Sequence, residues 1–467
     1  MIPIYELRIT LYNLYMNSET NYQSALDYLY SFVDYSLKHS SELAKADFNL
    51  DRMHALMAEL GHAQNAYPTI HVAGTKGKGS VSALCAAALR AAGYKTGLYT
   101  SPHLQDFCER IQVDGKPISH DALAALVDEI KPAVARVPKL TTFELTTALG
   151  FLYFARQHVD VAVIEVGLGG RLDATNVITP RVSVITSLSY DHTAVLGETL
   201  TLIAGEKAGI IKPNVPVVSS TQQDEALRVL EKVSAERNAP LTLIGRDVTY
   251  NLLNHSLDGQ TFNLQPSNFP TFTIPLLGKH QVENAVVAYA ALKASGLDVS
   301  DEKIHAGFAA VQWPARFELA QRENPTLIFD SAHNQDSFEK LAATLQEYFP
   351  GRKVSLIFGI SEDKHLLAML NAIAPLLMRV IVTRADHPRA LEPEKIIETA
   401  FSSGLGVSFK VGPDQTSGIP FEVAIPVETA LKRALDLSQK DGSIVVSAGS
   451  IFVTAESKAA YLLNKHG

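Results

Sequence analysis

A glycine-rich segment with two lysines is the part of the sequence with the clearest chemical character. Residues 71–80 read His-Val-Ala-Gly-Thr-Lys-Gly-Lys-Gly-Ser, between an apolar stretch and a run of small residues over 81–92. This order predicts a strand, a loop and a helix, in which backbone N–H groups, Lys78 and the Ser80 hydroxyl hold phosphate and Mg²⁺. A flexible glycine turn is the alternative, and the flanking strand and helix argue against it. The glycine after Lys78 departs from the G-x-x-x-x-G-K-[ST] spacing, which indicates a particular branch of ATP-binding proteins.

Three further polar residues stand at or just beyond the ends of predicted strands. They are Ser101, Glu165 and His192, and the apolar runs cover 96–100, 159–166 and 182–188. Ligands collect at the carboxyl ends of strands in open α/β sheets. A buried carboxylate such as Glu165 is costly unless it meets a cation, and Mg²⁺ suits oxygen ligands. We therefore expect a metal site here, in which Glu165 and His192 end neighbouring strands and share one Mg²⁺, against the alternatives of a turn serine and an ordinary histidine.

Two other clusters carry charge or hydrogen-bonding groups. Lys207 lies between Ile203 and Ile210 at an apolar helix end, where the simple alternative is a snorkelling or ion-paired lysine. Further along, Asn284 follows the opening of a helix and Asp330 ends a predicted strand. A carboxylate at a strand end suits a ribose, and an asparagine amide can pair with an adenine edge.

Val-rich runs separated by helical segments predict the elements that position these residues. Such runs without alternation favour a parallel sheet covered on both faces. Residues 241–277 interrupt this alternation of strands and helices and suggest an antiparallel patch. A second block of alternating strands and helices begins near residue 313. We predict an α/β protein with a large P-loop ATPase domain with a mostly parallel sheet, over 1–315, and a smaller Rossmann-like doubly wound domain, over 316–467.

Composition narrows the class of protein. The chain has 467 residues, 46% hydrophobic, with a net charge of -8, which argues against nucleic-acid binding. Two cysteines give no disulfide framework, which fits a reducing cytoplasm. No apolar run is long enough to span a membrane, and the N-terminus lacks the pattern of a signal peptide. The polar stretch from Met16 leaves open whether residues 1–15 are an extension.

In this order the motifs resemble the Mur ligase superfamily, and specifically bacterial folylpolyglutamate synthase/dihydrofolate synthase of the bifunctional type. The similarity runs from about residue 22 to 465. It rests on eight strings: GTKGKGS (74–80), TSPHL (100–104), EVGLGGRLDATN (165–176), DH (191–192), GEKAGI (205–210), KHQVEN (279–284), ARFE (315–318) and DSAHN (330–334). One departure is Lys76, where many bacterial members have asparagine.

The resemblance implies roles for the matching positions. ATP would be bound by Gly74, Thr75, Gly77, Lys78, Gly79 and Ser80, and from the far side of the cleft by Asn284, Arg316 and Asp330. The Mg²⁺ ligands would be Ser101, Glu165 and His192. The pterin substrate would be held by Thr141, Thr142, Phe143, Glu144, Leu172, Asp173 and Ala174. Lys78 and Lys207 would be catalytic, with Lys207 carbamylated, and His333 would position the incoming amine.

The implied activity is an ATP-dependent amide ligation. The γ-phosphoryl group of ATP would pass to a pteroate or folate carboxylate, and the amine of L-glutamate would displace phosphate from the acyl phosphate. Two Mg²⁺ ions are implied, and the resemblance allows a monovalent cation. We expect a cytoplasmic monomer that binds small molecules, and neither nucleic acid nor membrane. The alternatives are a cell-wall Mur enzyme, a P-loop kinase or GTPase, and an ATP-binding module without catalysis.

Overall fold

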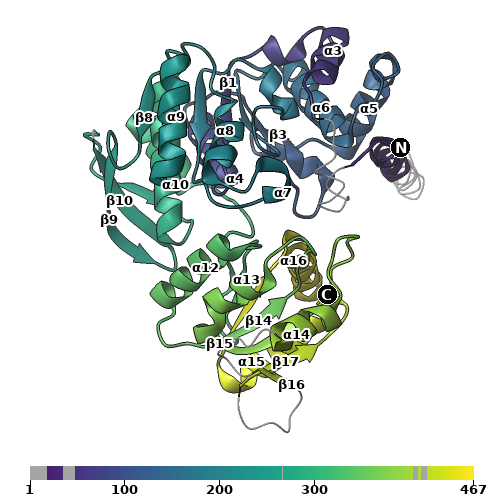
Figure 1. Cartoon of the computed structure of the whole chain (residues 1–467), viewed down its shortest axis with the longest axis vertical. Coiled ribbons are helices and arrows are strands. Elements are labelled where there is room, and N and C mark those ends of the chain that lie inside the picture. The colour runs from purple at the N-terminus through teal and green to yellow at the C-terminus, as the bar shows by residue number, and fades with distance from the viewer. Residues whose placement is uncertain (1–17, 35–47, 266, 403–408, 412–417, 467) are drawn as a thin grey trace, which may run out of the picture. The chain divides into compact units, whose positions relative to one another are not determined.

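The computed structural model describes residues 18–34, 48–265, 267–402, 409–411 and 418–466 (Figure 1). The expected extension 1–15 lies outside the described residues, as do part of the helical stretch 21–60 and the first residues of the strand expected over 407–411. By internal contacts the chain divides into two units. Unit 1 is Met1–Val248 with Val287–Gly307, and unit 2 is Thr249–Val286 with Phe308–Gly467. Both are α/β, which confirms the predicted fold class.

Unit 1 contains an eight-stranded, mostly parallel sheet. Its order is β4-β3-β2-β5-β1-β6-β7-β8. The strands are β1 (Thr69–Ala73), β2 (Thr96–Tyr99), β3 (Ile111–Val113), β4 (Lys116–Pro117), β5 (Val161–Glu165), β6 (Val182–Ile185), β7 (Val217–Ser219) and β8 (Leu241–Leu243). The central strands β1, β5 and β6 are buried at every residue, as Val-rich parallel strands require. The five strands expected here are confirmed, and the antiparallel pair β3 and β4 extends one edge.

Helices and short helical turns connect these strands. They are α3 (Asp51–Glu59), η1 (Ala63–Asn65), α4 (Lys78–Ala91), η2 (Phe107–Arg110), α5 (His120–Val134), α6 (Thr142–Arg156), η3 (Ala174–Val177), α7 (Thr193–Leu196), α8 (Leu200–Ala208) and α9 (Asp224–Glu236). A further helical segment covers 18–30. Helix α4 is buried over Ser80–Leu89, because its alanines let it pack closely on the sheet.

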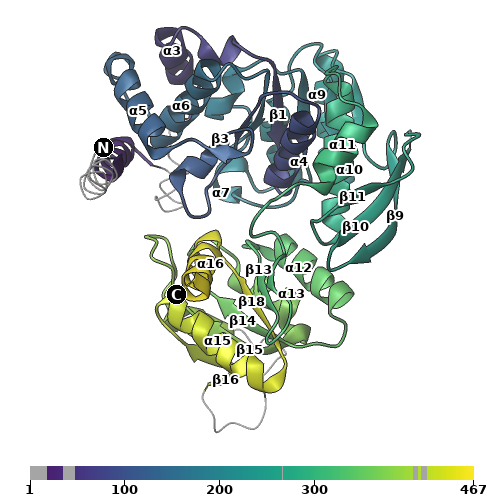
Figure 2. The same ribbon diagram turned by 180° about the vertical axis from the view of Figure 1, so that it is seen from behind.

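Unit 2 contains a seven-stranded sheet in the order β12-β13-β18-β14-β15-β17-β16 (Figure 2). The strands are β12 (Glu318–Gln321), β13 (Leu327–Phe329), β14 (Val354–Phe358), β15 (Leu377–Val382), β16 (Phe409–Val411), β17 (Ile419–Val423) and β18 (Ile444–Ala448). Only β12 pairs antiparallel in this sheet, among the described residues. The prediction did not include β12 or β17.

The helices of unit 2 cover both faces of this sheet. They are α12 (Gln335–Tyr348), α13 (Leu366–Ile373), η4 (Ala374–Leu376), α14 (Pro393–Ser402), α15 (Val427–Asp441) and α16 (Ile451–His466). Neighbouring residues of β14 show the two faces: Leu356 belongs to the core with α12, α13 and α14, and Ile357 to the core with α15 and α16. Alternation along a strand sends successive side chains to opposite faces, so this sheet is doubly wound, as predicted.

The antiparallel patch predicted over 241–277 is confirmed in part. Strands β9 (Thr249–Ser256), β10 (Gly259–Gln265) and β11 (Phe272–Ile274) form a separate antiparallel sheet, whereas β8 pairs in parallel with β7 of unit 1. Helices α10 (Lys279–Ala294) and α11 (Asp301–Ala309) follow. Unit 2 takes in residues 249–286 as well as the chain from Phe308, so the boundary after residue 315 stays a prediction.

Candidate functional site

The glycine loop connects β1 to α4 and is fixed by backbone contacts. Gly74 has a φ of 149°, and a Cβ there would lie 1.8 Å from Oγ1 of Thr186, so only glycine fits. The N–H groups of Thr75 and Lys76 donate to the carbonyl oxygen of Ser187 at 3.0 and 3.1 Å. The loop is thereby attached to the chain that follows β6, and its shape is set before any phosphate binds.

Two lysine ammonium groups meet at one carbonyl oxygen of this loop. The Nζ of Lys78 donates to the oxygen of Gly74 at 3.2 Å, and the Nζ of Lys207 donates to it at 2.9 Å. Lys207 is only 4% exposed, which rules out a surface lysine. Burial, and then the charge of Lys78, lowers the pKa of Lys207 to about 7. A substantial fraction of this buried amine is therefore neutral near neutral pH.

Glu165 and Ser101 lie at the same edge of the sheet as the loop. Glu165 ends β5 and is 5% exposed, and its register partner on the neighbouring strand β1 is Val72. The backbone N–H of Ser101 donates to Oε2 of Glu165 at 3.2 Å. The chain thus holds a buried carboxylate two residues along the register from Gly74, with the serine beside it.

The position of His192 relative to Glu165 differs from the one we expected. We expected Glu165 and His192 to end neighbouring strands, but β1 separates β5 from β6 in the sheet. His192 comes seven residues after the end of β6, with a φ of 50°, and occupies the N-cap position of α7, where it is exposed and its side chain makes no capping hydrogen bond. Sequence order could not reveal this, because strand order in a parallel sheet is set by tertiary packing. The assignment of Ser101, Glu165 and His192 as metal ligands stays a prediction.

An ion pair beside His192 was not foreseen. The Nζ of Lys76 lies 3.0 Å from Oδ2 of Asp191, and the two side chains are only 14% and 9% exposed. A largely buried ammonium needs a carboxylate partner, so the unusual lysine in the glycine loop was the signal that could have pointed to one. The positive charge that Lys76 adds to the loop is therefore balanced by Asp191.

The segment 141–144 contains a helix cap. Thr141 is the N-cap of α6: its hydroxyl accepts from the N–H of Glu144 at 3.2 Å, and the Glu144 carboxylate accepts from the N–H of Thr141 at 2.8 Å. Arg52 pairs with Glu144 at 3.0 Å, and the Thr142 hydroxyl donates to the carbonyl of Leu29 at 2.9 Å. The T-x-x-E spacing is the signature of a capping box and was visible in the sequence. The side chains of Thr141, Thr142 and Glu144 therefore make structural contacts in addition to any substrate role.

Phe143 connects the same segment to the chain after Glu165. Its ring lies so close to Gly167 that a Cβ there would be 2.4 Å from the ring. Asp173, 6% exposed, accepts from the N–H of Leu168 at 2.8 Å and from the hydroxyl of Thr175 at 2.5 Å, and burial raises its pKa. Ala174 belongs to the buried core against which Phe143 packs, so the structure brings together the two segments expected to hold the substrate, and Leu172 precedes Asp173 in the chain.

Four further expected residues belong to unit 2, namely Asn284, Arg316, Asp330 and His333. Asp330 accepts from the N–H groups of Phe317 and Ala332 at 2.7 and 2.8 Å; burial raises its pKa, and the charge of Arg316 acts in the opposite direction. Nδ1 of His333 lies 2.8 Å from the carbonyl oxygen of Ser331. A carbonyl only accepts, so Nδ1 carries a proton, and in the neutral ring Nε2 has the lone pair.

Asn284 lies in α10 and is 8% exposed. Its amide donates to Oε1 of Gln281, one turn earlier, at 3.0 Å. This contact fixes the orientation of the amide. Each expected residue therefore has a defined place in its unit, and the nucleotide roles of Asn284, Arg316 and Asp330 stay predictions.

Comparison with known proteins identifies the family. The model of the Mur ligase middle domain matches residues 72–292, and that of the Mur ligase, glutamate ligase domain matches residues 315–451. The dihydrofolate synthase/folylpolyglutamate synthase of Bacillus subtilis is 37% identical over 384 residues, 79% of this chain and 87% of the relative. The protein of the same name from Mycobacterium tuberculosis is 37% identical over 425 residues, 85% of this chain and 86% of the relative. The chain belongs to the dihydrofolate synthase/folylpolyglutamate synthase family of Mur ligases.

Solved structures of proteins with the same family name are also similar to this chain. Mycobacterium tuberculosis folylpolyglutamate synthase complexed with ADP and AMPPCP has a TM-score of 0.80 at 36% identity, covering 90% of this chain and 97% of that chain. E. coli FolC in complex with DHPP and ADP also has a TM-score of 0.80, at 30% identity, covering 95% and 98%. The predicted resemblance is confirmed, and the chain is an ATP-dependent ligase that acts on small molecules.

No helix in the part of the chain that the structure describes is both long enough and apolar enough to cross a membrane.

Proposed function

We propose that this folylpolyglutamate synthase family member joins L-glutamate to the carboxylate of a reduced folate and also to that of dihydropteroate. One observation carries the proposal. The chain holds Lys78 and Lys207 on the carbonyl of Gly74, with Glu165 at the same sheet edge. This arrangement suits the transfer of a phosphoryl group, which depends on positioning and charge stabilisation.

The reaction then has two steps. A carboxylate oxygen of the folate attacks the γ-phosphorus of ATP, the bond to the β-phosphate oxygen breaks, and ADP leaves. The amine nitrogen of L-glutamate attacks the acyl carbon, the bond to the phosphate oxygen breaks, and phosphate leaves as the amine loses a proton. The loop N–H groups, Lys78 and Ser80 would hold the phosphates, with Asn284, Arg316 and Asp330 contacting the nucleotide.

The residues expected to bind magnesium are suited to ions that bind together with the nucleotide, and not to ions held by protein side chains alone. Among the described residues, neither Glu165 nor His192 belongs to a group of three His, Cys, Asp or Glu side chains close enough to hold an ion alone. Mg²⁺ characteristically uses one or two protein ligands and completes its shell with phosphate and water. Two ions would neutralise charge on the phosphates, and Ser101, Glu165 and His192 would be the protein ligands. A monovalent cation is a further candidate.

We also propose that Lys207 reacts with CO₂. The neutral amine nitrogen bonds to the carbon of CO₂ and loses a proton, which gives a carbamate anion. Burial among apolar residues and the neighbouring charge of Lys78 support this, because both favour the neutral amine. The modification exchanges a positive charge for a negative one, which would bind a cation instead of repelling it.

The substrate end of the site would use the segments that Phe143 brings together. The Phe143 ring offers a flat apolar surface for a pterin, and Asp173 has a fixed carboxylate. His333, with Nδ1 held by Ser331, would position the amine of L-glutamate. We expect the enzyme to work as a cytoplasmic monomer, and light scattering of the purified chain tests the monomer.

One assay tests the proposed function. Phosphate release from ATP is measured with L-glutamate plus dihydropteroate or tetrahydrofolate, and the product is identified by mass spectrometry. Release with both acceptors, each gaining one glutamyl residue, is the expected result. Release with one acceptor alone would remove the other activity. No glutamylated product from either acceptor would overturn the proposal.

A further inference from the structure

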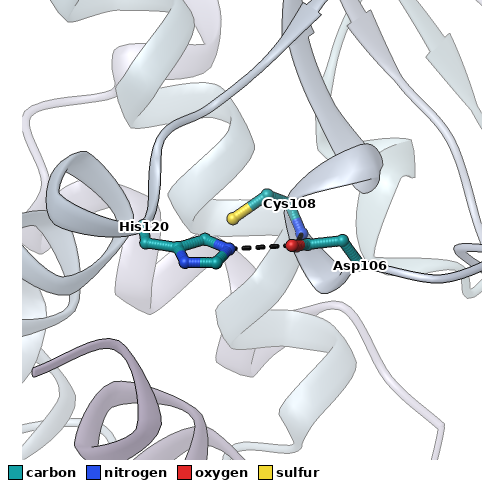
Figure 3. Close-up of side chains that lie close together, drawn as sticks. All are labelled: Asp106, Cys108 and His120. Carbon is teal, nitrogen blue, oxygen red and sulfur yellow. Dashed lines mark hydrogen bonds and ion pairs between the residues drawn. The ribbon is translucent and has the colours of Figure 1, made fainter. Parts of the chain in front are cut away.

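A cluster of three different side chains lies apart from the residues assigned above. Asp106 precedes η2, Cys108 lies within it, and His120 is the first residue of α5 (Figure 3). A carboxylate oxygen, the thiol sulfur and a ring nitrogen all lie within 4.8 Å of one another. Nε2 of His120 is 2.8 Å from Oδ2 of Asp106. None of the three is among the residues expected to bind ATP, folate or magnesium.

We propose that Asp106, Cys108 and His120 form a Zn²⁺ site. Thiolate, imidazole and carboxylate are the ligands that Zn²⁺ takes, and at its bond lengths tetrahedral ligand atoms are separated by about 3.3–3.6 Å. The Asp106 to His120 distance needs to open by only about half an ångström to admit the ion. Mg²⁺ and Ca²⁺ prefer oxygen, so this donor set favours zinc over both.

The carboxylate is already oriented for this role. Oδ1 of Asp106 accepts from the N–H of Cys108 at 2.7 Å and from the hydroxyl of Tyr22 at 3.0 Å. Oδ2 is therefore the oxygen directed at His120. A ligand oriented by other groups loses little freedom when the metal binds.

The imidazole is oriented as well. The rings of His120 and Tyr22 stack at 3.7 Å with an angle of 1° between their planes. Nδ1 of His120 lies 3.1 Å from Oε1 of Glu19, on the side away from Asp106. Metal-bound histidines usually donate their second N–H to a carboxylate in this way, which fixes the tautomer that presents Nε2 to the metal.

The charges of the ligands and their exposure to solvent also suit a Zn²⁺ site. A thiolate and a carboxylate balance the two charges of Zn²⁺, so the site is neutral. Cys108 is 2% exposed, whereas the side chains of Asp106 and His120 are 41% and 29% exposed, which leaves room for a water as fourth ligand. On binding, the S–Zn bond replaces the S–H bond, the N–Zn bond replaces the Nε2–H bond that faces Asp106 in the metal-free site, and the two protons pass to water.

The site would connect three parts of unit 1. Its ligands come from the start of α5 and from η2, and Glu19 and Tyr22 belong to the helical segment 18–30. The ion would therefore hold this segment to the body of the unit. A reactive thiol is the other use of a cysteine, and it requires access to solvent, which Cys108 lacks at 2% exposure.

Cobalt substitution of the full chain tests the proposal. The protein is treated with chelator, freed of it, and titrated with Co²⁺ alone. A thiolate bound to Co²⁺ gives a strong near-ultraviolet charge-transfer absorption, which Co²⁺ on oxygen ligands of a nucleotide site lacks. We expect this absorption to saturate at one equivalent and to disappear when one equivalent of Zn²⁺ is added.

Cysteine variants provide the matched control, because the chain has two cysteines. Cys108→Ser should lose the absorption, and Cys85→Ala, which alters a buried thiol in α4, should keep it. Glu19→Gln should keep it but weaken Zn²⁺ binding by about tenfold or more. No charge-transfer absorption in the wild type overturns the proposal, as does its persistence in Cys108→Ser or its loss in Cys85→Ala.

Discussion

Lys78 and Lys207 donate to the same acceptor, the carbonyl oxygen of Gly74, at 3.2 and 2.9 Å. Lys78 opens α4 and Lys207 lies near the end of α8, so the glycine loop brings together lysines 129 positions apart in the sequence. Two ammonium groups at one oxygen repel each other, and burial penalises the charge of Lys207 further. This relationship is the physical basis for assigning Lys207 a chemical role.

Replacing Lys207 tests that role. Lys207→Met should lower kcat by about 100-fold or more, because it removes the charged group that we propose to act on the transferring phosphoryl group. Acetate should restore part of the activity by occupying the position of the carbamate. Lys212→Met is the matched control, since Lys212 donates to the carbonyl of Asn176 and should retain most turnover. Full activity of Lys207→Met without acetate would contradict the assignment.

The stability of the free protein should depend on pH through the same lysine. Its pKa falls from 10.5 in the unfolded chain to about 7 in the fold, so between these values the unfolded state binds the extra proton. Stability should therefore rise with pH over that range, by at most about 1.4 kcal/mol per pH unit. Urea unfolding of wild type and Lys207→Met at pH 7 to 9, without CO₂ or nucleotide, measures the difference. A difference that does not change with pH would exclude a depressed lysine pKa.

Variants at Phe143 and Glu144 should distinguish an effect on substrate binding from an effect on helix capping. Glu144→Gln weakens the capping box and the pair with Arg52, and it should lower the free energy of unfolding by about 1 kcal/mol with little change in the folate KM. Phe143→Leu removes the aromatic surface, and it should raise that KM by about tenfold, the effect of about 1.4 kcal/mol of lost contact. The assignment of capping to Glu144 and of substrate contact to Phe143 is wrong if Glu144→Gln raises the folate KM as much as Phe143→Leu does.

Much of the fold was predictable because burial leaves a simple pattern. Strand β1 begins and ends at the expected residues, Thr69 and Ala73, since a central parallel strand is buried at every residue and therefore mostly apolar. Strand β17 was missed because Pro420 and an alternating burial pattern mark it as only half buried. Strand β8 was grouped with the antiparallel patch because three residues carry too little pattern to show which sheet they join.

The site was predictable as motifs but not as contacts. The glycine loop, Glu165 and Lys207 are local signals of type and spacing. The pairing of Lys76 with Asp191 spans 115 positions and depends on how the loop after β6 folds back. The capping role of Thr141 was a local signal that the substrate interpretation overlooked. Tertiary packing, not residue type, places β1 between β5 and β6 and so separates Glu165 from His192.

The carboxylate of Glu165 should be indispensable for turnover. Glu165→Gln keeps the size of the side chain and removes the charge expected to bind a cation, so kcat should fall by about 100-fold at saturating Mg²⁺. Glu206→Gln is the control, because the half-buried Glu206 pairs with the exposed Arg171 at 2.8 Å. Steady-state phosphate release measures both variants. Turnover of Glu165→Gln near that of wild type would place the cation elsewhere.

Oxygen isotope transfer tests the central claim, an amide ligation through an acyl phosphate, most directly. The folate or dihydropteroate carboxylate is labelled with ¹⁸O, the complete reaction with ATP and L-glutamate is run, and the released phosphate is analysed by mass spectrometry. An acyl phosphate requires one labelled oxygen to leave with phosphate in each turnover, because the carboxylate oxygen that attacks ATP later departs from the acyl carbon. Unlabelled phosphate accompanying glutamylated product would contradict the mechanism.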